Sequence, residues 1–291
     1  MHIALATCSN LPDGEVDDAP FHQALARRGV TAPQVVWDDP EADWSQYDAV
    51  LTRYTWDYME KHAAFVAWAM HVEHVTRLFN SAAVVAWNTN KSYLRDLEAS
   101  GVSIAPTIWL EQGQSVEVAQ LMTERNWQRG FIKPLIGATA RETLRFNADE
   151  SGLAEARAHL QRTLANENMM LQPYLNKVET EGEISAIFID GEVSHCVRKI
   201  PVPGDYRVQD NFGASDELYV FSEEELEQAR QAHRAAGGDL LYARADFLRD
   251  DSGGLVLTEF EAVEPSLFFR HDPEAGERLA DALCARVASA I

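Results

Sequence analysis

The sequence has little cysteine and little positive charge. Its three cysteines, Cys8, Cys196 and Cys284, lie far apart and form no Cys-x-x-Cys pair. This spacing excludes a disulfide framework and a structural zinc site. Lysine and arginine number 25 against 46 aspartate and glutamate residues, which gives a net charge of −21 over 291 residues. Such an acidic chain has no general attraction for nucleic acid or for an anionic membrane, and we expect neither as a partner.

Long hydrophobic runs and several common enzyme motifs are also absent. No stretch approaches 18 uninterrupted apolar residues, and the first residues lack the basic segment of a signal peptide. The sequence contains no GxGxxG, no P-loop lysine after glycine, no HExxH and no GxSxG. Hydrophobic residues make up 46% of the chain, enough for a large core. We therefore expect a cytoplasmic globular protein of about two domains.

The first part of the chain alternates short β-branched strands with helices. Strands are predicted at 2–8, 33–38, 47–53 and 77–80, and helices lie between them. This alternation indicates a small parallel sheet in a first domain over residues 1–88. Ligands of such sheets meet the loops at the carboxyl ends of the strands, which here are residues 7–18 and 53–58.

The remainder, residues 89–291, is predicted to form a second domain of α/β (α+β) class with antiparallel sheets. A mobile lid is expected over about 110–175 and a catalytic subdomain over about 176–291. The clearest signals are a hairpin over 183–199, which turns at Asp190-Gly191, and a capping box at Ser222 and Glu225. Residues 242–248 and 255–263 are expected to pair as antiparallel strands.

Carboxylates gather on that last strand pair. Glu259 and Glu261 are two residues apart and share a face, and a tight turn would bring Asp246 opposite them. Three carboxylates on one face repel each other unless a cation lies among them, and oxygen ligands suit Mg²⁺. Arg244 falls on the same face. The alternative is a solvated sheet face that carries an ordinary ion pair.

Two lysines in a chain with only five are candidate phosphate ligands. Lys133 ends a strand and precedes a loop of small residues with Gly137, where backbone N–H groups can approach phosphates closely. Lys91 lies near the start of a helix. Each of them, taken alone, also fits a solvated surface lysine.

The order and spacing of these features resemble the ATP-grasp carboxylate–amine ligases over residues 80–265. The resemblance rests on Lys91, on Lys133 with its glycine loop, and on QPYL at 172–175, GEIS at 182–185, Arg-x-Asp at 244–246 and Glu-x-Glu at 259–261. It implies an ATP-grasp fold with a preceding substrate domain. It also implies ATP and Mg²⁺ as cofactors, and a substrate carboxylate that is activated as an acyl phosphate and then attacked by an amine.

The resemblance also implies roles for single residues. Lys91, Lys133 and Gly137 would contact the nucleotide phosphates, and Gln172, Tyr174 and Leu175 would surround the adenine. Glu183 would bind ribose, with Glu179 as a competing candidate. Arg244 would contact the transferred phosphate, with Arg207 or Lys199 as substitutes in a catalytic role. Asp246, Glu259 and Glu261 would hold Mg²⁺, although many relatives have asparagine at the position of Glu261.

Within the family, RYTWDY at 53–58, the NKxYLxxLxxxGVxxAPT pattern at 90–107 and residues 182–209 look closest to the cyclo-ligases that form D-cycloserine from O-ureido-D-serine in antibiotic biosynthesis. This implies a small amino-acid-like substrate held by residues of the first domain and by Arg207. The predicted first-domain substrate residues are Arg53, Thr55, Asp57, Tyr58, Asp17 and Asp18.

Two other functions stay open at this point. The first is an intermolecular amino-acid or peptide ligase of the glutathione synthetase type, and the second is an inactive nucleotide-binding regulatory protein. The resemblance to the family also implies that the protein forms a homodimer.

Overall fold

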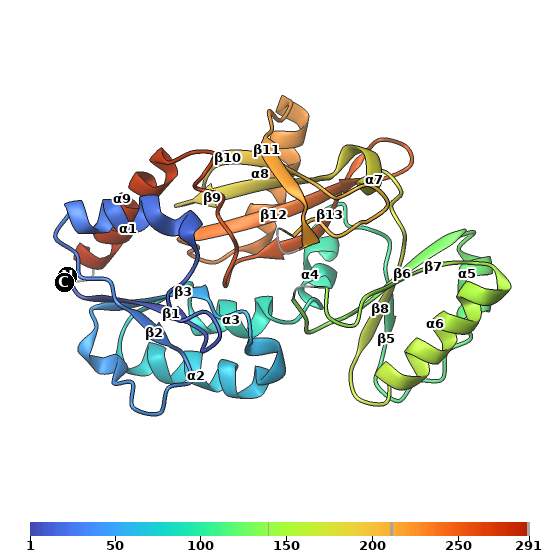
Figure 1. Ribbon diagram of the computed structural model, residues 1–291, viewed down its shortest axis with the longest axis horizontal. Coiled ribbons are helices and arrows are strands. Elements are labelled where there is room, and N and C mark those ends of the chain that lie inside the picture. The colour runs from blue at the N-terminus through green and yellow to red at the C-terminus, as the bar shows by residue number, and fades with distance from the viewer. Residues whose placement is uncertain (139, 210–211, 290–291) are drawn as a thin grey trace.

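The computed structural model describes residues 1–138, 140–209 and 212–289. Three sheets follow one another across the molecule (Figure 1). A parallel sheet lies at one end, an antiparallel five-stranded sheet occupies the middle, and a small four-stranded sheet forms the other end. Within the described residues, no helix is both long enough and apolar enough to cross a membrane.

The first sheet has the strand order β2-β1-β3-β4, and its pairs are parallel, as the sequence predicts. Its strands are β1 (Ile3–Thr7), β2 (Gln34–Val36), β3 (Ala49–Tyr54) and β4 (Leu78–Phe79). Helices α2 (His62–Val75) and α3 (Ala82–Asn88) cover one face, and α1 (Ala19–Arg27) lies on the other (Figure 1). All six residues of β3 are buried, as expected for a central parallel strand covered on both faces.

The small sheet at the other end has the order β5-β8-β6-β7 and corresponds to the expected lid. It consists of β5 (Ile108–Leu110), β6 (Arg129–Pro134), β7 (Leu144–Asn147) and β8 (Met169–Pro173). Helices α5 (Val118–Glu124) and α6 (Glu150–Thr163) pack on it around a separate hydrophobic core that includes Met122, Ile132 and Leu160. A core of its own allows this unit to move as a body.

The central sheet has the order β11-β10-β9-β12-β13. Its strands are β9 (Glu183–Ile189), β10 (Glu192–Ile200), β11 (Ser215–Leu218), β12 (Tyr242–Arg249) and β13 (Leu255–Glu261). Helices α4 (Tyr93–Ala99) and α8 (Glu223–Ala236) supply part of its core, and α7 (Val178–Glu181) is a single turn before β9. Asp190 and Gly191 have φ of 53° and 84°, which is the predicted type I′ turn, and the predicted capping box is present at Ser222.

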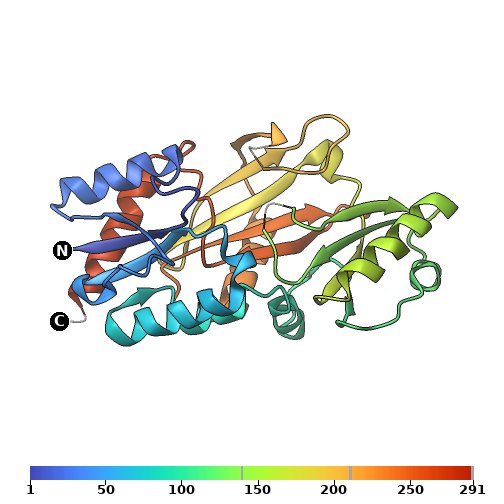
Figure 2. The same ribbon diagram turned by 60° about the horizontal axis from the view of Figure 1, so that its bottom comes forward.

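The last helix, α9 (Glu274–Ala288), connects the central and first sheets. It packs against α1, and Leu279 and Leu283 share one core with Ile3 and Leu5 of β1 and with Ile187 of β9. Figure 2 shows α1, α9 and both chain termini at the same end of the molecule. Because one core spans both sheets, the first and central sheets form a continuous platform for a site between them.

Candidate active site

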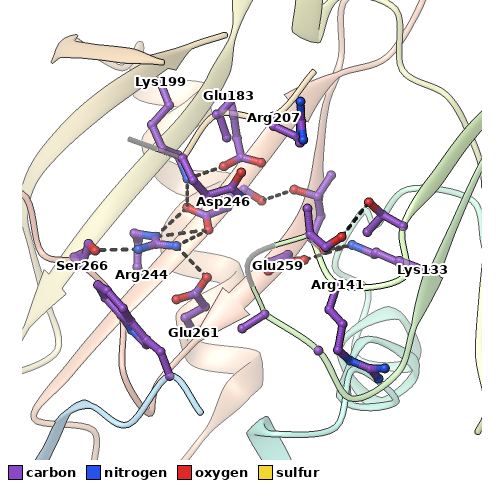
Figure 3. Close-up of a pocket in the computed structure, with 18 of the residues that line it drawn as sticks. Lys133, Arg141, Glu183, Lys199, Arg207, Arg244, Asp246, Glu259, Glu261 and Ser266 are labelled. Atoms are coloured by element: carbon purple, nitrogen blue, oxygen red, sulfur yellow. Dashed lines mark hydrogen bonds and ion pairs between the residues drawn. The ribbon is translucent and has the colours of Figure 1, made fainter. Parts of the chain in front are cut away.

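A cavity of about 690 Å³ lies where the three sheets meet. The loops after β1 and β3 line one wall, the lid strands β6 and β8 line another, and β9, β10, β12 and β13 supply the charged floor. Figure 3 shows these charged side chains converging from the different elements. A deep polar cavity at a junction of units is a common setting for a ligand site.

The register of β12 against β13 brings the predicted carboxylates and arginine together. Arg244 is opposite Glu261, and Asp246 is opposite Glu259. The guanidinium of Arg244 donates two bonds of 2.9 Å to the Asp246 carboxylate and one of 2.6 Å to Glu261 Oε1. It also donates to the carbonyl oxygen of Ser266 at 3.0 Å (Figure 3). The sequence-based placement of these four side chains on one face is therefore confirmed.

Both predicted phosphate-binding lysines reach the same carboxylate from different elements. Lys133 Nζ, at the end of β6, donates to Glu259 Oε1 at 3.1 Å. Lys91 Nζ lies 3.6 Å from the same oxygen and donates to the carbonyl oxygen of Gly137 at 2.9 Å. Lys91 thereby connects the small-residue loop to the cavity floor. Two ammonium groups and the glycine loop thus lie close to Glu259.

Lys199 on β10 lies between two acidic side chains. Its Nζ contacts Glu183 Oε1 and lies 3.3 Å from Asp246 Oδ1. Asp246 also accepts a hydrogen bond from Ser185 Oγ at 2.5 Å. These contacts extend the charge network of Arg244 along the floor as far as Glu183 (Figure 3).

The charges along the floor are unevenly neutralised. Burial by itself favours the neutral acid, yet Lys91 and Lys133 lower the pKa of Glu259 to about 2, and Arg244 with Lys199 holds the pKa of Asp246 far below its ordinary value. Burial raises the pKa of Glu261 to about 7 despite Arg244. Burial, together with nearby Glu261, raises the pKa of Glu264 to about 8. Glu261 and Glu264 are thus less fully neutralised than Glu259 and Asp246.

The three predicted metal ligands do not form a ready-made metal cluster. Across the described ranges, no group of three His, Cys, Asp or Glu side chains is arranged to hold a metal ion. The reason is that Asp246 and Glu261 turn toward Arg244, whereas Glu259 turns toward the two lysines. The donor set still fits Mg²⁺ bound together with a nucleotide, because carboxylate oxygens suit it, Glu261 is under-neutralised and phosphates supply further oxygens.

The expected adenine-binding segment lies on β8 and just after it. Gln172, Tyr174 and Leu175 all line the cavity, and Gln172 Nε2 donates to Thr107 Oγ1 at 2.9 Å. Of the two candidate ribose ligands, Glu183 lines the cavity. Glu179 instead accepts the hydroxyl of Tyr174 at 2.6 Å and pairs with Arg129 and Arg145 outside it.

Three of the predicted substrate residues do not face the cavity in the described structure. The Arg53 side chain is 0% exposed and donates to both oxygens of Asp18, at 2.8 and 2.9 Å, and to the carbonyl oxygen of Pro265. Thr55 is fully buried, and Tyr58 stacks on Phe65 in the core of the first domain. Core packing and a buried ion pair use these three side chains in this structure, so the expectation that they contact substrate directly stays a prediction.

The other predicted substrate residues line the cavity but already have partners. Asp18 is paired with Arg53, and Asp17 accepts the backbone N–H groups of Phe269 and Arg270. Asp57 accepts the indole N–H of Trp37 at 2.7 Å. Arg207 stands at the rim, where it makes a double contact with Asp205, and Figure 3 shows it beyond Glu183 and apart from Arg244.

Sequence reasoning missed the segment that follows β13. Glu264 and Ser266 both line the cavity, three and five residues after Glu261. The sequence signal was a further glutamate before a proline directly after the Glu-x-Glu strand.

Comparison with known proteins agrees with this arrangement. Residues 3–80 match the family model of the D-cycloserine synthetase DcsG N-terminal domain, and residues 104–242 match that of the prokaryotic glutathione synthetase ATP-grasp domain. The cycloserine biosynthesis protein DcsG of Streptomyces lavendulae is 32% identical over 288 residues, which cover 94% of each chain. The chain belongs to the DcsG family of ATP-grasp ligases.

Solved structures of the family agree in fold. The crystal structure of D-cycloserine synthetase DcsG superposes with a TM-score of 0.90 at 30% identity, covering 99% of this chain and 100% of that one. D-alanine–D-alanine ligase from Bacillus anthracis with ATP superposes with a TM-score of 0.72 at 13% identity, and the match covers 100% of this chain and 98% of that one. The ATP-grasp ligase PsnB with a minimal precursor, Mg and ADP superposes with a TM-score of 0.66 at 18% identity, and the match covers 98% of each chain. The predicted α/β ATP-grasp fold and the predicted ligase class are confirmed.

Proposed function

We propose that this ligase closes a ring within one small amino acid, converting O-ureido-D-serine to D-cycloserine. The observation that carries the proposal is the likeness to DcsG along nearly the whole chain, including the first domain, whose loops line the cavity. A likeness confined to the ATP-grasp part would support nucleotide use only, because the first domain supplies the wall where a substrate specific to this family would bind.

In the proposed reaction, the substrate carboxylate oxygen attacks the γ-phosphorus of ATP and ADP leaves, giving an acyl phosphate. The substrate nitrogen that is bonded to oxygen then attacks the acyl carbon, a C–N bond forms, the proton leaves that nitrogen, and phosphate departs with its electron pair. Ring closure alone leaves the carbamoyl group on the ring nitrogen. Its removal consumes one water and yields carbon dioxide and ammonia, which completes the atom balance.

Residues of this chain have separate parts in that sequence. Arg244 presents a planar fork beside Asp246 and Glu261 and stabilises charge on the transferring phosphoryl group. Lys91 and Lys133 hold the nucleotide phosphates, and Glu183 holds the ribose. Glu259, Glu261 and Asp246 would hold Mg²⁺, which when bound neutralises phosphate charge and orients the phosphates for transfer.

Closure of the lid would protect the acyl phosphate from water. The small-residue loop of the lid already contacts the first domain, since the backbone N–H of Ala138 lies 3.4 Å from Met59 Sδ. Holding carboxylate and nucleophile in one enclosed molecule replaces a bimolecular encounter, which can lower a barrier by several kcal/mol. The D configuration of the substrate and a homodimeric state stay predictions.

The test is ADP release from ATP with O-ureido-D-serine as the sole added amino acid, with the cyclic product identified by mass. We expect ADP and D-cycloserine to form in equal amounts without any second amine. O-ureido-L-serine and serine without the ureido group serve as controls. Strict dependence of turnover on a separate amine would refute cyclisation and favour an intermolecular ligase, whereas ADP formation with no added carboxylate would point to an ATPase.

A further inference from the structure

An amino-acid substrate brings a positively charged α-ammonium group into a cavity with many acidic side chains. Several of them already have partners: Asp18 is paired with Arg53, Asp57 accepts the Trp37 indole, and Asp246 and Glu261 hold Arg244. Glu60 lines the same cavity but is exposed. An ammonium group gains most from a carboxylate that is buried and has no other cation to satisfy.

Glu264 meets that description. Its side chain lines the cavity and the residue is only 8% exposed. In the part of the chain that the structure describes, the Glu264 carboxyl makes no ion pair and no hydrogen bond with a side chain, and Lys91 and Arg244 act on its pKa only as charges farther away. A buried carboxyl group without a partner is costly, and a binding role is the usual reason for such a group to persist.

The backbone around Glu264 is fixed by side chains of the first domain and of β12. The carbonyl oxygen of Val263 accepts from Thr52 Oγ1 at 2.5 Å, and that of Glu264 accepts from the Trp56 indole at 3.0 Å. The next two carbonyl oxygens, of Pro265 and Ser266, accept from Arg53 at 3.2 Å and from Arg244 at 3.0 Å. Four successive carbonyls are thus held by the first domain and by β12.

We propose that Glu264 binds the α-ammonium group of the amino-acid substrate and so fixes which way the substrate lies in the cavity. The assignment rests on the proposed function, because it requires an amino acid as substrate. Arg53 and Thr52, both fully buried, act as positioning residues, since they hold the segment that carries Glu264, and the Trp56 indole holds the same segment.

The orientation follows from the neighbouring Arg244. Ser266, two residues after Glu264, is bonded to Arg244, which also contacts Glu261 (Figure 3). With its ammonium on Glu264, an amino acid has its carboxylate one carbon away and therefore close to the phosphoryl-transfer region around Arg244. The side-chain nitrogen is then free to fold back onto the activated carboxyl carbon. A cation beside Glu264 also favours its ionised form, which offsets the cost of burial.

The experiment compares O-ureido-serine with its deamino analogue, in which hydrogen replaces the α-amino group, in the wild-type enzyme and in Glu264→Gln. We expect the wild-type KM for the deamino analogue to be about 10- to 100-fold higher, the range of one charge-assisted hydrogen bond. Glu264→Gln should raise the KM for O-ureido-serine by a similar factor and should distinguish the two compounds poorly. The KM for ATP should stay unchanged in the variant, which shows that the nucleotide half is folded.

Glu60→Gln is the matched control, since it removes the same charge from an exposed residue of the same cavity and should keep the wild-type preference. If the wild-type enzyme accepts both compounds equally, or if Glu264→Gln keeps the full preference for the amino compound, the assignment is overturned and the ligase function stands. The wild-type comparison holds even if the variant fails to fold. If no α-amino acid supports ADP release by the wild-type enzyme, the proposed function fails, and this assignment fails with it.

Discussion

Replacing Arg53 by methionine tests whether this residue is a structural pair or a substrate ligand. In the structure its side chain is 0% exposed, pairs with Asp18, whose side chain is 2% exposed, and holds the carbonyl oxygen of Pro265. Methionine keeps much of the volume but removes the charge and every donor. The change therefore leaves the Asp18 carboxylate buried without a cation, and this is the main cost.

The size of that cost follows from leaving one partner of a buried ion pair behind. Breaking such a pair by removing one partner costs about 3–5 kcal/mol. Arg53→Met should therefore lower the free energy of unfolding by an amount in this range.

The assay is urea unfolding of the wild-type chain and of Arg53→Met at pH 7, with Arg27→Met as the control. Arg27 forms an ion pair with Glu277 on the surface, where its side chain is 58% exposed, and its loss should cost less than about 1 kcal/mol. Adding Asp18→Asn to Arg53→Met should restore part of the stability. Unchanged stability of Arg53→Met together with a raised KM for the amino acid would refute this reasoning and return Arg53 to the substrate site.

Three further predictions concern catalysis. Arg244→Lys keeps the charge but loses the fork that contacts Asp246 and Glu261, so kcat should fall by about 10³-fold or more while ATP still binds. Steady-state ADP release measures kcat, and nucleotide titration measures ATP binding. A near-normal kcat would exclude Arg244 as the phosphoryl contact. Glu259→Gln should abolish Mg²⁺-dependent turnover without loss of the fold, measured by ADP release across a Mg²⁺ series and by circular dichroism. Glu183→Gln should raise the KM for ATP about 10-fold whereas Glu179→Gln should not, and the reverse result would assign the ribose to Glu179.

Four strands of the central sheet, β9, β10, β12 and β13, could be predicted because local rules and tertiary structure agree there, whereas the edge strand β11 was not predicted. The Asp190-Gly191 turn fixes the β9–β10 hairpin, and strand alternation alone places Glu259 and Glu261 on one face. A tight turn then leaves little freedom in how Asp246 meets them. For the same reason the sequence predicts which charged side chains of this sheet come together, although it does not predict which of them form ion pairs. Which carboxylate meets which cation depends on Lys91 and Lys133, which come from other elements.

The first-domain half of the site could not be predicted in the same way. Every residue of β3 is buried, so the pattern of apolar and polar positions cannot show which side chains face a ligand. Arg53 looks like a substrate ligand in the sequence because arginine at a strand end is normally exposed. Its burial depends on Asp18 and on Pro265, which lies 212 residues away. The same long-range contacts hold Glu264 in place, so the unexpected burial of Arg53 and the omission of Glu264 both come from one region where distant segments meet.

The ion pairs on the cavity floor explain how a site this rich in charge can be stable and still bind a polyanion with its metal. Lys91 and Lys133 neutralise Glu259, and Arg244 neutralises Asp246 and part of Glu261, so most of the charge on the floor already has a partner. By the proposed function, the two lysines and Arg244 would hold the triphosphate of ATP, and the carboxylates would hold Mg²⁺. The charges on the floor would then exchange one partner of opposite sign for another. Binding both together would leave fewer charges buried without a partner than binding either one alone.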